Sequence, residues 1–308
     1  MDTVNRRSRT ILLYAVLAAL AASLPLLALA LRKHSGRPST AAPAASGVVD
    51  PRLPRPGGIV LARESGKLAV ALSARTGTGR LALTATVLGP DGGGASGRRV
   101  AFSGGGRRIG GTACGSGCYE ASLPGAPRRI TVIVDGAEVP FELPARARPA
   151  SALVRRVGES LRKARSLVID ERLASSPKHA IRARFEVAAP NRLTYRIAGG
   201  ADAVVIGGRR WDRATPGEAW IPSSQTPLQL PAVPWSSAAR DAHFIGAGPR
   251  FWLVTLLDPQ IPAWFELRID KRTLRPIEVR MVAGAHFMRD RYSHYDAPIR
   301  IRPPTSRG

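Results

Sequence analysis

Cys114 and Cys118 are the two cysteines of the chain, and their spacing suggests chemistry most directly. The intervening Gly-Ser-Gly can turn, which would bring the two Cα atoms within about 7 Å, as a disulfide requires. Two thiolates could instead hold a soft metal such as copper(I), and two free thiols are the third alternative. Two cysteines exclude a multi-disulfide scaffold and a four-cysteine zinc site. We expect a disulfide and no resident cofactor.

Potential metal ligands are densest near the C-terminus, where His286, Met288, Asp290 and His294 follow Met281. In a strand, alternate side chains share one face, so the four even-numbered residues would point the same way. Histidine, methionine and carboxylate side chains on one face could bind a metal. The alternative, which we expect, is a half-exposed edge strand of mixed polarity. His286, Met288 and His294 remain candidate ligands.

No arrangement of residues in the sequence indicates catalysis. The five histidines lie in no motif that would pair a base with a nucleophile, and a Gly-x-Ser-x-Gly elbow is absent. The glycine-rich stretch at 104–108 lacks the Lys-Ser/Thr of a phosphate-binding loop. The chain is therefore predicted not to be an enzyme.

The formal net charge of +24 is extreme, and only five of the 46 basic residues are lysine. A GC-rich genome that favours arginine codons explains this usage more simply than a nucleic-acid groove does. Nucleic-acid-binding modules interleave aromatic residues with a basic stripe, whereas the aromatic residues here follow apolar periodicity. We expect no nucleic-acid partner, and either a solvated basic surface or contact with anionic membrane head groups.

An uncharged, apolar run from Thr10 to Leu31 is long enough for a helix that crosses a bilayer. Arginines precede it, so residues 1–9 are expected in the cytoplasm. The alternative is a cleaved signal peptide, because Ala28-Leu29-Ala30 resembles a cleavage site. The sequence thus predicts a single-pass anchor at 10–31, a disordered linker at 32–57 and domains outside the cytoplasm.

The exported part divides in two, because all five tryptophans follow Pro149 and the stretch 144–149 has the composition of a linker. Residues 58–144 alternate apolar and polar residues in short runs that glycine-rich turns separate. Such runs, with no helical stretch between them, predict a small immunoglobulin-like β-sandwich in a mainly β chain.

The second domain, residues 149–304, opens with helical periodicity from Leu153 to Ala164 and continues with alternating strands. We interpret it as an α+β half-barrel with a covering helix, over which the segment from Pro216 to Pro249 could act as a lid. Apolar residues at strand spacing are predicted to line an apolar cavity: Phe185, Leu193, Tyr195, Ile206, Trp252, Val254, Phe265 and Leu267.

Motifs in both domains resemble those of known families. The length of the first domain and its Gly-Cys-Tyr element resemble the YtkA-like immunoglobulin-type domains of exported bacterial proteins. The segments 185–195, 205–211 and 265–270 resemble the LolA-like fold of lipoprotein carriers and lipid-binding lipoproteins. The stretch 286–304 is similar to the exported regions of actinobacterial CopC/CopD-type copper-resistance fusions. The chain lacks their multi-span membrane part, and its first domain has no histidine for a copper site.

The resemblances and the apolar strands together predict a membrane-anchored, exported protein that holds a lipid or other apolar ligand in the half-barrel. Lipid or lipoprotein acyl chains are then the expected partners, besides the membrane itself. One alternative is a metal-handling or sensing accessory of the cell envelope that uses the cysteines or the C-terminal ligands. Another is a structural envelope protein whose half-barrel is filled by its own side chains.

Overall fold

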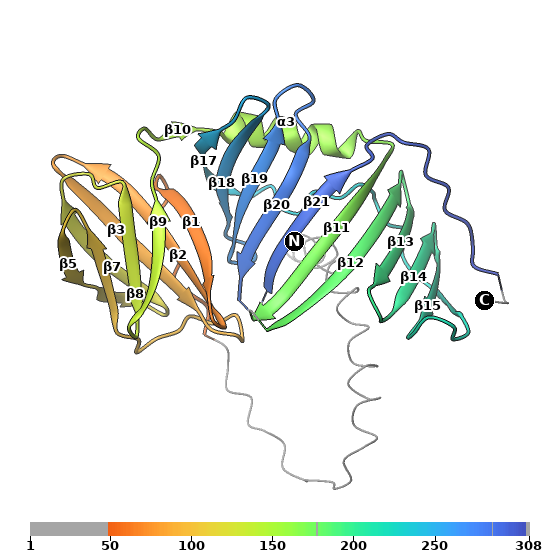
Figure 1. The fold of residues 1–308 in the computed structure, drawn as a ribbon, viewed down its shortest axis with the longest axis horizontal. Helices are drawn as coiled ribbons and strands as arrows, with labels where there is room; N and C mark the ends of the chain where they lie inside the picture. Colours follow the sequence, from red (N-terminus) through yellow and green to blue (C-terminus); the bar gives the residue numbers. More distant parts are fainter. Residues whose placement is uncertain (1–48, 177, 285, 306–308) are drawn as a thin grey trace, which may run out of the picture.

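The computed structural model describes residues 49–176, 178–284 and 286–305, which form two β-rich units side by side (Figure 1). The first unit is a sandwich of a five-stranded and a four-stranded antiparallel sheet. In sheet order, the first sheet contains β1 (Ile59–Ser65), β2 (Leu68–Gly77), β3 (Arg80–Leu88), β7 (Cys118–Pro124) and β6 (Thr112–Gly115). The second contains β5 (Arg107–Gly110), β4 (Val100–Gly104), β8 (Arg129–Val134) and β9 (Ala137–Glu142).

The core of the sandwich is built by alternate residues of its strands, which point between the two sheets. Leu72 and Leu83 from the first sheet pack in one cluster with Phe102, Ile130 and Phe141 from the second, and all five are fully buried. The period-two alternation in the sequence is thus the direct cause of this core.

The predicted disulfide between Cys114 and Cys118 is confirmed, with the two Cα atoms 5.1 Å apart. It links β6 to β7 across a tight turn, where Gly117 adopts a φ of +63° that a side chain would disfavour. Within the described ranges, the group of His, Cys, Asp or Glu side chains close enough for a metal consists of these cysteines and Glu120. Because the two sulfurs are bonded to each other, neither is a thiolate ligand.

The second unit is one antiparallel sheet of twelve strands, in which the last strand of the chain pairs with β11. Its first half, in sheet order, is β10 (Arg148–Pro149), β17 (Arg240–Ala247), β18 (Phe251–Asp258), β19 (Ala263–Asp270), β20 (Pro276–Ala283) and β21 (His286–Ser293). Its second half is β11 (Ser166–Ser176), β12 (His179–Ala188), β13 (Arg192–Ile197), β14 (Asp202–Ile206), β15 (Arg209–Arg213) and β16 (Ile221–Ser224).

One face of this sheet, the inner face, packs against helix α3 (Ser151–Arg162) and against residues 226–239, here called the covering segment. The buried side of α3 is the apolar stripe Val154, Val157 and Leu161. The covering segment contributes Val233 and Trp235 to the same core. It is fixed at Ser236, whose backbone N–H and hydroxyl both donate to the buried Asp258 carboxylate at 2.6 and 2.8 Å.

The opposite, outer face of the sheet packs against β1 of the sandwich. Val60 and Ala62 of β1 share a buried cluster with Trp264, Leu257 and Phe287 of the sheet. The buried Thr255 hydroxyl lies 2.5 Å from the carbonyl oxygen of Val60, which gives this apolar interface a polar anchor. The two units are therefore joined by a continuous core.

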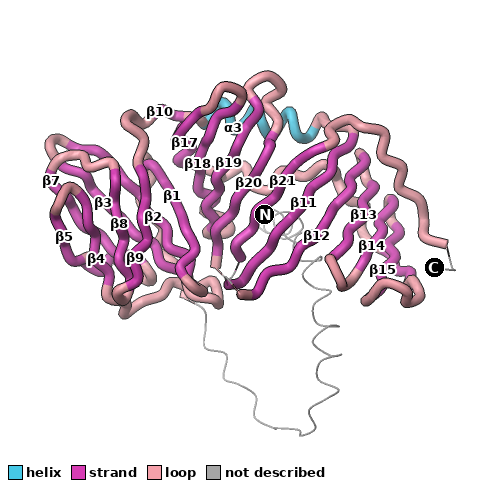
Figure 2. Tube along the Cα trace, viewed as in Figure 1, coloured by secondary structure: helices cyan, strands magenta, loops and turns pink. Residues whose placement is uncertain are grey.

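The α+β half-barrel with a covering helix is wrong as a description of this unit. Strands dominate both units (Figure 2), and α3, with 12 residues, is the one helix within the described part of the chain. A helix of three turns offers one narrow apolar stripe, which cannot cover twelve strands. The covering segment, which has no regular structure over most of its length, covers the rest of the packed part of the inner face.

The predicted single-pass membrane anchor is not supported. Within the described residues, no helix is long and apolar enough to cross a membrane. Residues 10–31, where the anchor was predicted, lie outside that part. The predicted location in a membrane was inferred from this anchor, so it is not supported either.

Removing the disulfide should destabilise the sandwich without unfolding it. The closed loop is only five residues long, so the chain-entropy model gives a loss of about 2 kcal/mol on changing Cys114 and Cys118 to Ala. Urea unfolding followed by far-ultraviolet circular dichroism measures this loss. Wild-type protein treated with a reductant should lose the same amount, and equal midpoints for oxidised wild type and variant would contradict the prediction.

Candidate functional site

The residues predicted to line an apolar cavity lie mostly in one core on the inner face. Trp252 is half-buried at the edge of that core, where its ring meets Phe244 edge-on at 6.3 Å. Ile206 lies outside the core because its neighbour Val205 points inward and successive strand residues alternate. The buried members of the set are Phe185, Leu193, Tyr195, Val254, Phe265 and Leu267.

An apolar row crosses the inner face at right angles to the strands. Its members stand directly opposite one another on β18, β19, β20, β21, β11 and β12, and we call them the apolar row. They are Leu256, Phe265, Met281, Met288, Leu173 and Ile181.

Cover over the apolar row ends partway across the sheet. At one end Leu256 is fully buried, and Trp235 of the covering segment stands edge-on to Phe265 with 6.3 Å between ring centroids. At the other end Leu173 is only half-buried and Ile181 is 41% exposed. Contiguous apolar surface can mark the binding of an apolar partner, and Ile181 continues the half-buried surface of Leu173. The uncovered end of the row is the candidate site.

Two carboxyl groups, Glu171 and Asp290, stand beside the apolar row on adjacent strands. They are direct cross-strand partners between β11 and β21, and we call them the carboxyl pair. The Tyr292 hydroxyl lies 3.4 Å from Oδ2 of Asp290, which is long for a hydrogen bond. The buried Oδ1 of Asp290 has no hydrogen-bond partner among the residues that the structure describes. An unpartnered buried oxygen is costly and calls for an explanation.

Burial keeps the carboxyl pair protonated. It raises the pKa of Glu171 to about 7, and burial together with the charge of Glu171 raises the pKa of Asp290 well above its usual range. Two like charges on facing residues cannot both ionise cheaply, so the pair retains at least one proton at neutral pH. Burial, then the nearby Glu171 charge, raises the pKa of Tyr195 to about 12, against the opposing effect of Arg210. The site is therefore apolar, with the retained carboxyl proton and the tyrosine hydroxyls as donors and the carboxyl oxygens as acceptors.

The C-terminal metal candidates are not brought together. His286 is exposed, with Nδ1 3.0 Å from the carbonyl oxygen of Gly284, whereas Met288 is buried in the inner core. His294 follows the end of β21 in a left-handed conformation with a φ of +52°, and its Nδ1 contacts the Ser293 hydroxyl at 2.9 Å. The alternation that was expected to align these residues stops before His294.

The role of the carboxyl pair was missed in the sequence. Asp290 was considered only as a metal ligand, and Glu171 was not singled out. The available signal was the position of Glu171 between Ile169 and Leu173, where alternation demands an inward side chain. A carboxyl group at an inward position of a half-buried strand is unusual enough to mark a site.

No protein-family model matches the chain, and no curated protein matches it either. The resemblances to YtkA-like and LolA-like domains, and to the copper-resistance fusions, therefore stay predictions.

The carboxyl pair predicts an inverse dependence of stability on pH. The unfolded Glu171 ionises near its usual pKa of 4.5, whereas the folded side chain holds its proton to about pH 7. The free energy of unfolding should consequently fall as pH rises through this interval. Glu171→Gln removes this titration and should reduce the fall by about 2 kcal/mol, the full shift being discounted for partial exposure.

Urea unfolding between pH 4.5 and 8, followed by tryptophan fluorescence, measures this dependence. Glu218→Gln is the matched control, because Glu218 is exposed in a loop. Equal pH dependence in wild type and Glu171→Gln would contradict the raised pKa.

Proposed function

We propose that this protein is a non-catalytic binding protein for a lipid whose acyl chain lies along the uncovered end of the apolar row. The observation that carries the proposal is the row itself, which runs from a closed core at Leu256 to an exposed Ile181 without a charged residue. An acyl chain would continue the packing that the covering segment provides over Phe265.

The carboxyl pair favours a neutral polar end for this lipid. A fatty-acid carboxylate beside Glu171 and Asp290 would place a further negative charge in a poorly solvated place, where burial already disfavours the ionisation of the pair. A hydroxyl group could donate a hydrogen bond to the unpartnered Oδ1 of Asp290, and its oxygen could accept a hydrogen bond from the carboxyl proton that the pair retains. A monoacylglycerol or long-chain alcohol therefore fits the site better than a free fatty acid does.

The available area is sufficient for measurable affinity. The uncovered end of the row lies on β11 and β12, because Met288 on β21 is buried, and the half-buried Ile169 and Ile197 belong to the same face. Burial of a methylene contributes about 0.8 kcal/mol, so eight methylenes provide about 6 kcal/mol before the losses of association. The hydrogen bonds at the carboxyl pair would add to this and fix the orientation of the ligand.

Titration of the full chain with a fluorescently labelled monoacylglycerol tests the proposal. Binding should be saturable and should weaken at least tenfold in Leu173→Asp or Ile181→Asp, because a charge in the row must be desolvated when the acyl chain binds. A fatty acid with the same label and chain length should bind more weakly at pH 8 than the glyceride does.

The matched control is Ile221→Asp. Ile221 is 68% exposed on β16, four strands away from β12, so the substitution adds the same charge to the same sheet outside the site. Unsaturable binding by wild type, or equal weakening by Ile221→Asp and Ile181→Asp, would contradict the proposed function.

A further inference from the structure

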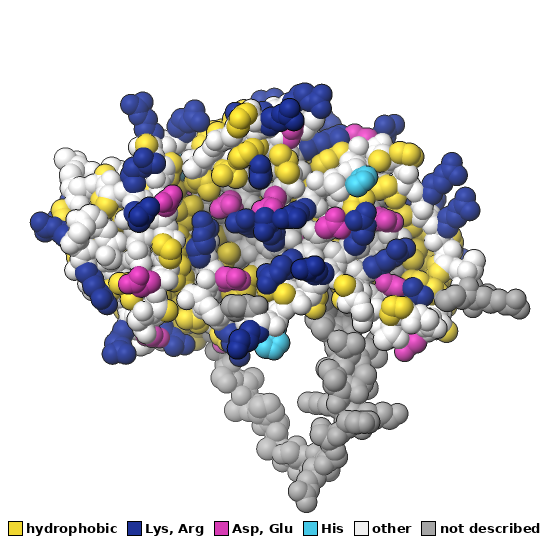
Figure 3. Space-filling view, in the orientation of Figure 1, with side chains coloured by type: hydrophobic (Ala, Val, Ile, Leu, Met, Phe, Trp, Pro, Cys, Tyr) yellow, Lys and Arg dark blue, Asp and Glu magenta, His cyan; other side chains and the backbone are white. Residues whose placement is uncertain are grey.

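The outer face of the twelve-stranded sheet carries two neighbouring cross-strand rows of charged residues, and Lys and Arg gather along the middle of this face (Figure 3). One row alternates in sign from β12 to β19, as Arg184, Asp170, Arg291, Glu278 and Arg268. The other, which we call the arginine row, reads Arg182, Arg172, Arg289 and Arg280 before it reaches Glu266. Like charges placed directly opposite destabilise a sheet, so the arginine row needs an explanation.

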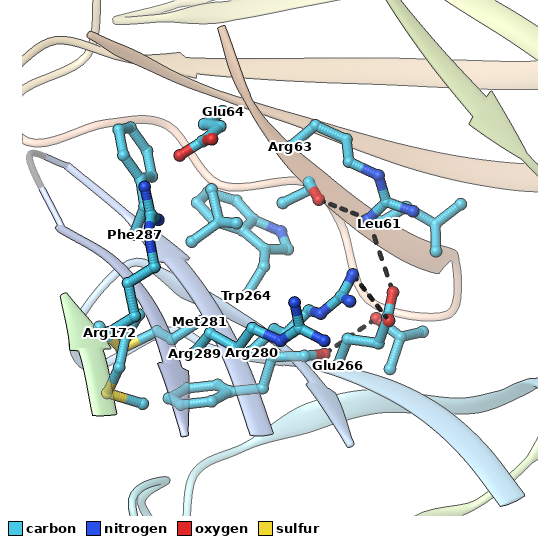
Figure 4. A pocket seen from close by; sticks show the side chains of 15 residues that line it. Leu61, Arg63, Glu64, Arg172, Trp264, Glu266, Arg280, Met281, Phe287 and Arg289 are labelled. Carbon is cyan, nitrogen blue, oxygen red and sulfur yellow. Dashed lines mark hydrogen bonds and ion pairs between the residues drawn. The ribbon is translucent and has the colours of Figure 1, made fainter. Parts of the chain in front are cut away.

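Three members of the arginine row line a pocket of about 280 Å³ where the sheet meets the sandwich. Figure 4 shows Arg172, Arg280 and Arg289 on one side of this pocket, opposite Arg63 and Glu64 of β1. The buried aromatic side chains of Trp264 and Phe287 give the pocket an apolar wall.

The carboxylates around the pocket do not satisfy its arginines. Arg280 and Arg289 share Glu278, at 2.8 and 2.7 Å, and Glu278 also faces Arg291 at 3.6 Å. Glu266 is shared as well, because Arg63 lies 3.5 Å from it and Arg280 lies 3.8 Å from it.

Two guanidinium donor groups in the pocket lack an acceptor among the described residues. The Arg172 guanidinium has no hydrogen-bond or ion-pair partner among the described residues. Across the described part of the chain, the buried Nε of Arg289 likewise finds no acceptor. The lining contains four arginines and two glutamates, and Glu278, which pairs with two of these arginines, still leaves an excess of one positive charge. A buried guanidinium donor without an acceptor is destabilising unless a ligand supplies one.

We infer that this pocket binds a phosphate monoester with a small apolar or aromatic group. A phosphoryl group near neutral pH carries close to two negative charges, and its three oxygens can accept from the Arg172 guanidinium and from Nε of Arg289, which have no acceptor among the described residues. A carboxylate carries one charge in one plane and would leave part of the row unpaired. Trp264 and Phe287 would contact the apolar part of the ester. The arginines of this site lie on the face opposite the apolar row, although Phe265, Met281 and Met288 of that row also border the pocket, and the inference does not rest on the proposed lipid site.

Isothermal titration of the full chain with phenyl phosphate tests the inference. We expect saturable binding of one molecule per chain, weakened about tenfold in Arg172→Gln, which is the loss of one charge-assisted pair. Arg172 has no partner to lose in the described structure, so this variant should fold normally. Arg172→Lys, which keeps the charge but lacks the fork, should bind with intermediate affinity.

The matched control is Arg184→Gln. Arg184 lies on the same face and has its own partner in Asp170 at 2.8 Å, but it does not line the pocket. If Arg184→Gln and Arg172→Gln weakened the binding of phenyl phosphate equally, the binding would reflect the general charge of this face and not a specific site. Benzoate binding as tightly as phenyl phosphate would overturn the phosphoryl preference. Equal affinity for inorganic phosphate would contradict a contribution from the organic group of the ester. A titration of phenyl phosphate whose heats do not saturate would contradict the site as a whole.

Discussion

The antiparallel register of the twelve-stranded sheet is the constraint on which both candidate sites depend. Because side chains alternate between faces, a single register places Leu173 beside Met288 on the inner face and Arg172 beside Arg289 on the outer face. A slip of one residue in β11 would move Glu171 out of the core and carry Asp170 into it. The carboxyl pair and the arginine row are therefore two consequences of one alignment of strands.

This register is held by the cores on the two faces. On the inner face, α3 and the covering segment pack against Val254 and Phe265, and the Asp258 carboxylate holds the covering segment at Ser236. On the outer face, Trp264 packs against β1 of the sandwich. The inner cover extends across the sheet to β14 but leaves Leu173 on β11 and Ile181 on β12 only partly covered, and on the outer face β1 packs mainly against β17 to β20. Both candidate sites include residues of β11.

The sequence predicted the strands well where alternation was clean, and it predicted the disulfide from the spacing of the cysteines and the expected export of the chain. It failed where the outcome depends on pairing between distant segments. The arginine row aligns residues more than one hundred positions apart, such as Arg172 and Arg289, and periodicity within one segment contains no information on that alignment. Ile206 was assigned to the inner face because Val204, Val205 and Ile206 form a continuous apolar run, in which alternation does not distinguish the faces. The helical periodicity from Leu153 to Ala164 correctly predicted a helix. Its length did not indicate how much of the sheet the helix covers.

Both sites reduce the stability of the folded chain, which is typical of residues retained for binding. A protonated carboxyl pair with an unpartnered oxygen is destabilising in an apolar core, and so is a row of arginines that its carboxylates neutralise only in part. In each case, replacement by apolar or oppositely charged residues would suit the fold better. Ligands that supply the missing hydrogen-bond partners would explain why unfavourable groups occur on both faces.

Native mass spectrometry of the purified full chain tests the central claim, lipid binding on the inner face, most directly. We expect a complex heavier than the bare chain by the mass of one neutral acyl lipid. This complex should disappear when the protein is denatured and should be less abundant for Ile181→Asp. A single species at the mass of the bare chain, both as purified and after incubation with a monoacylglycerol, would contradict it.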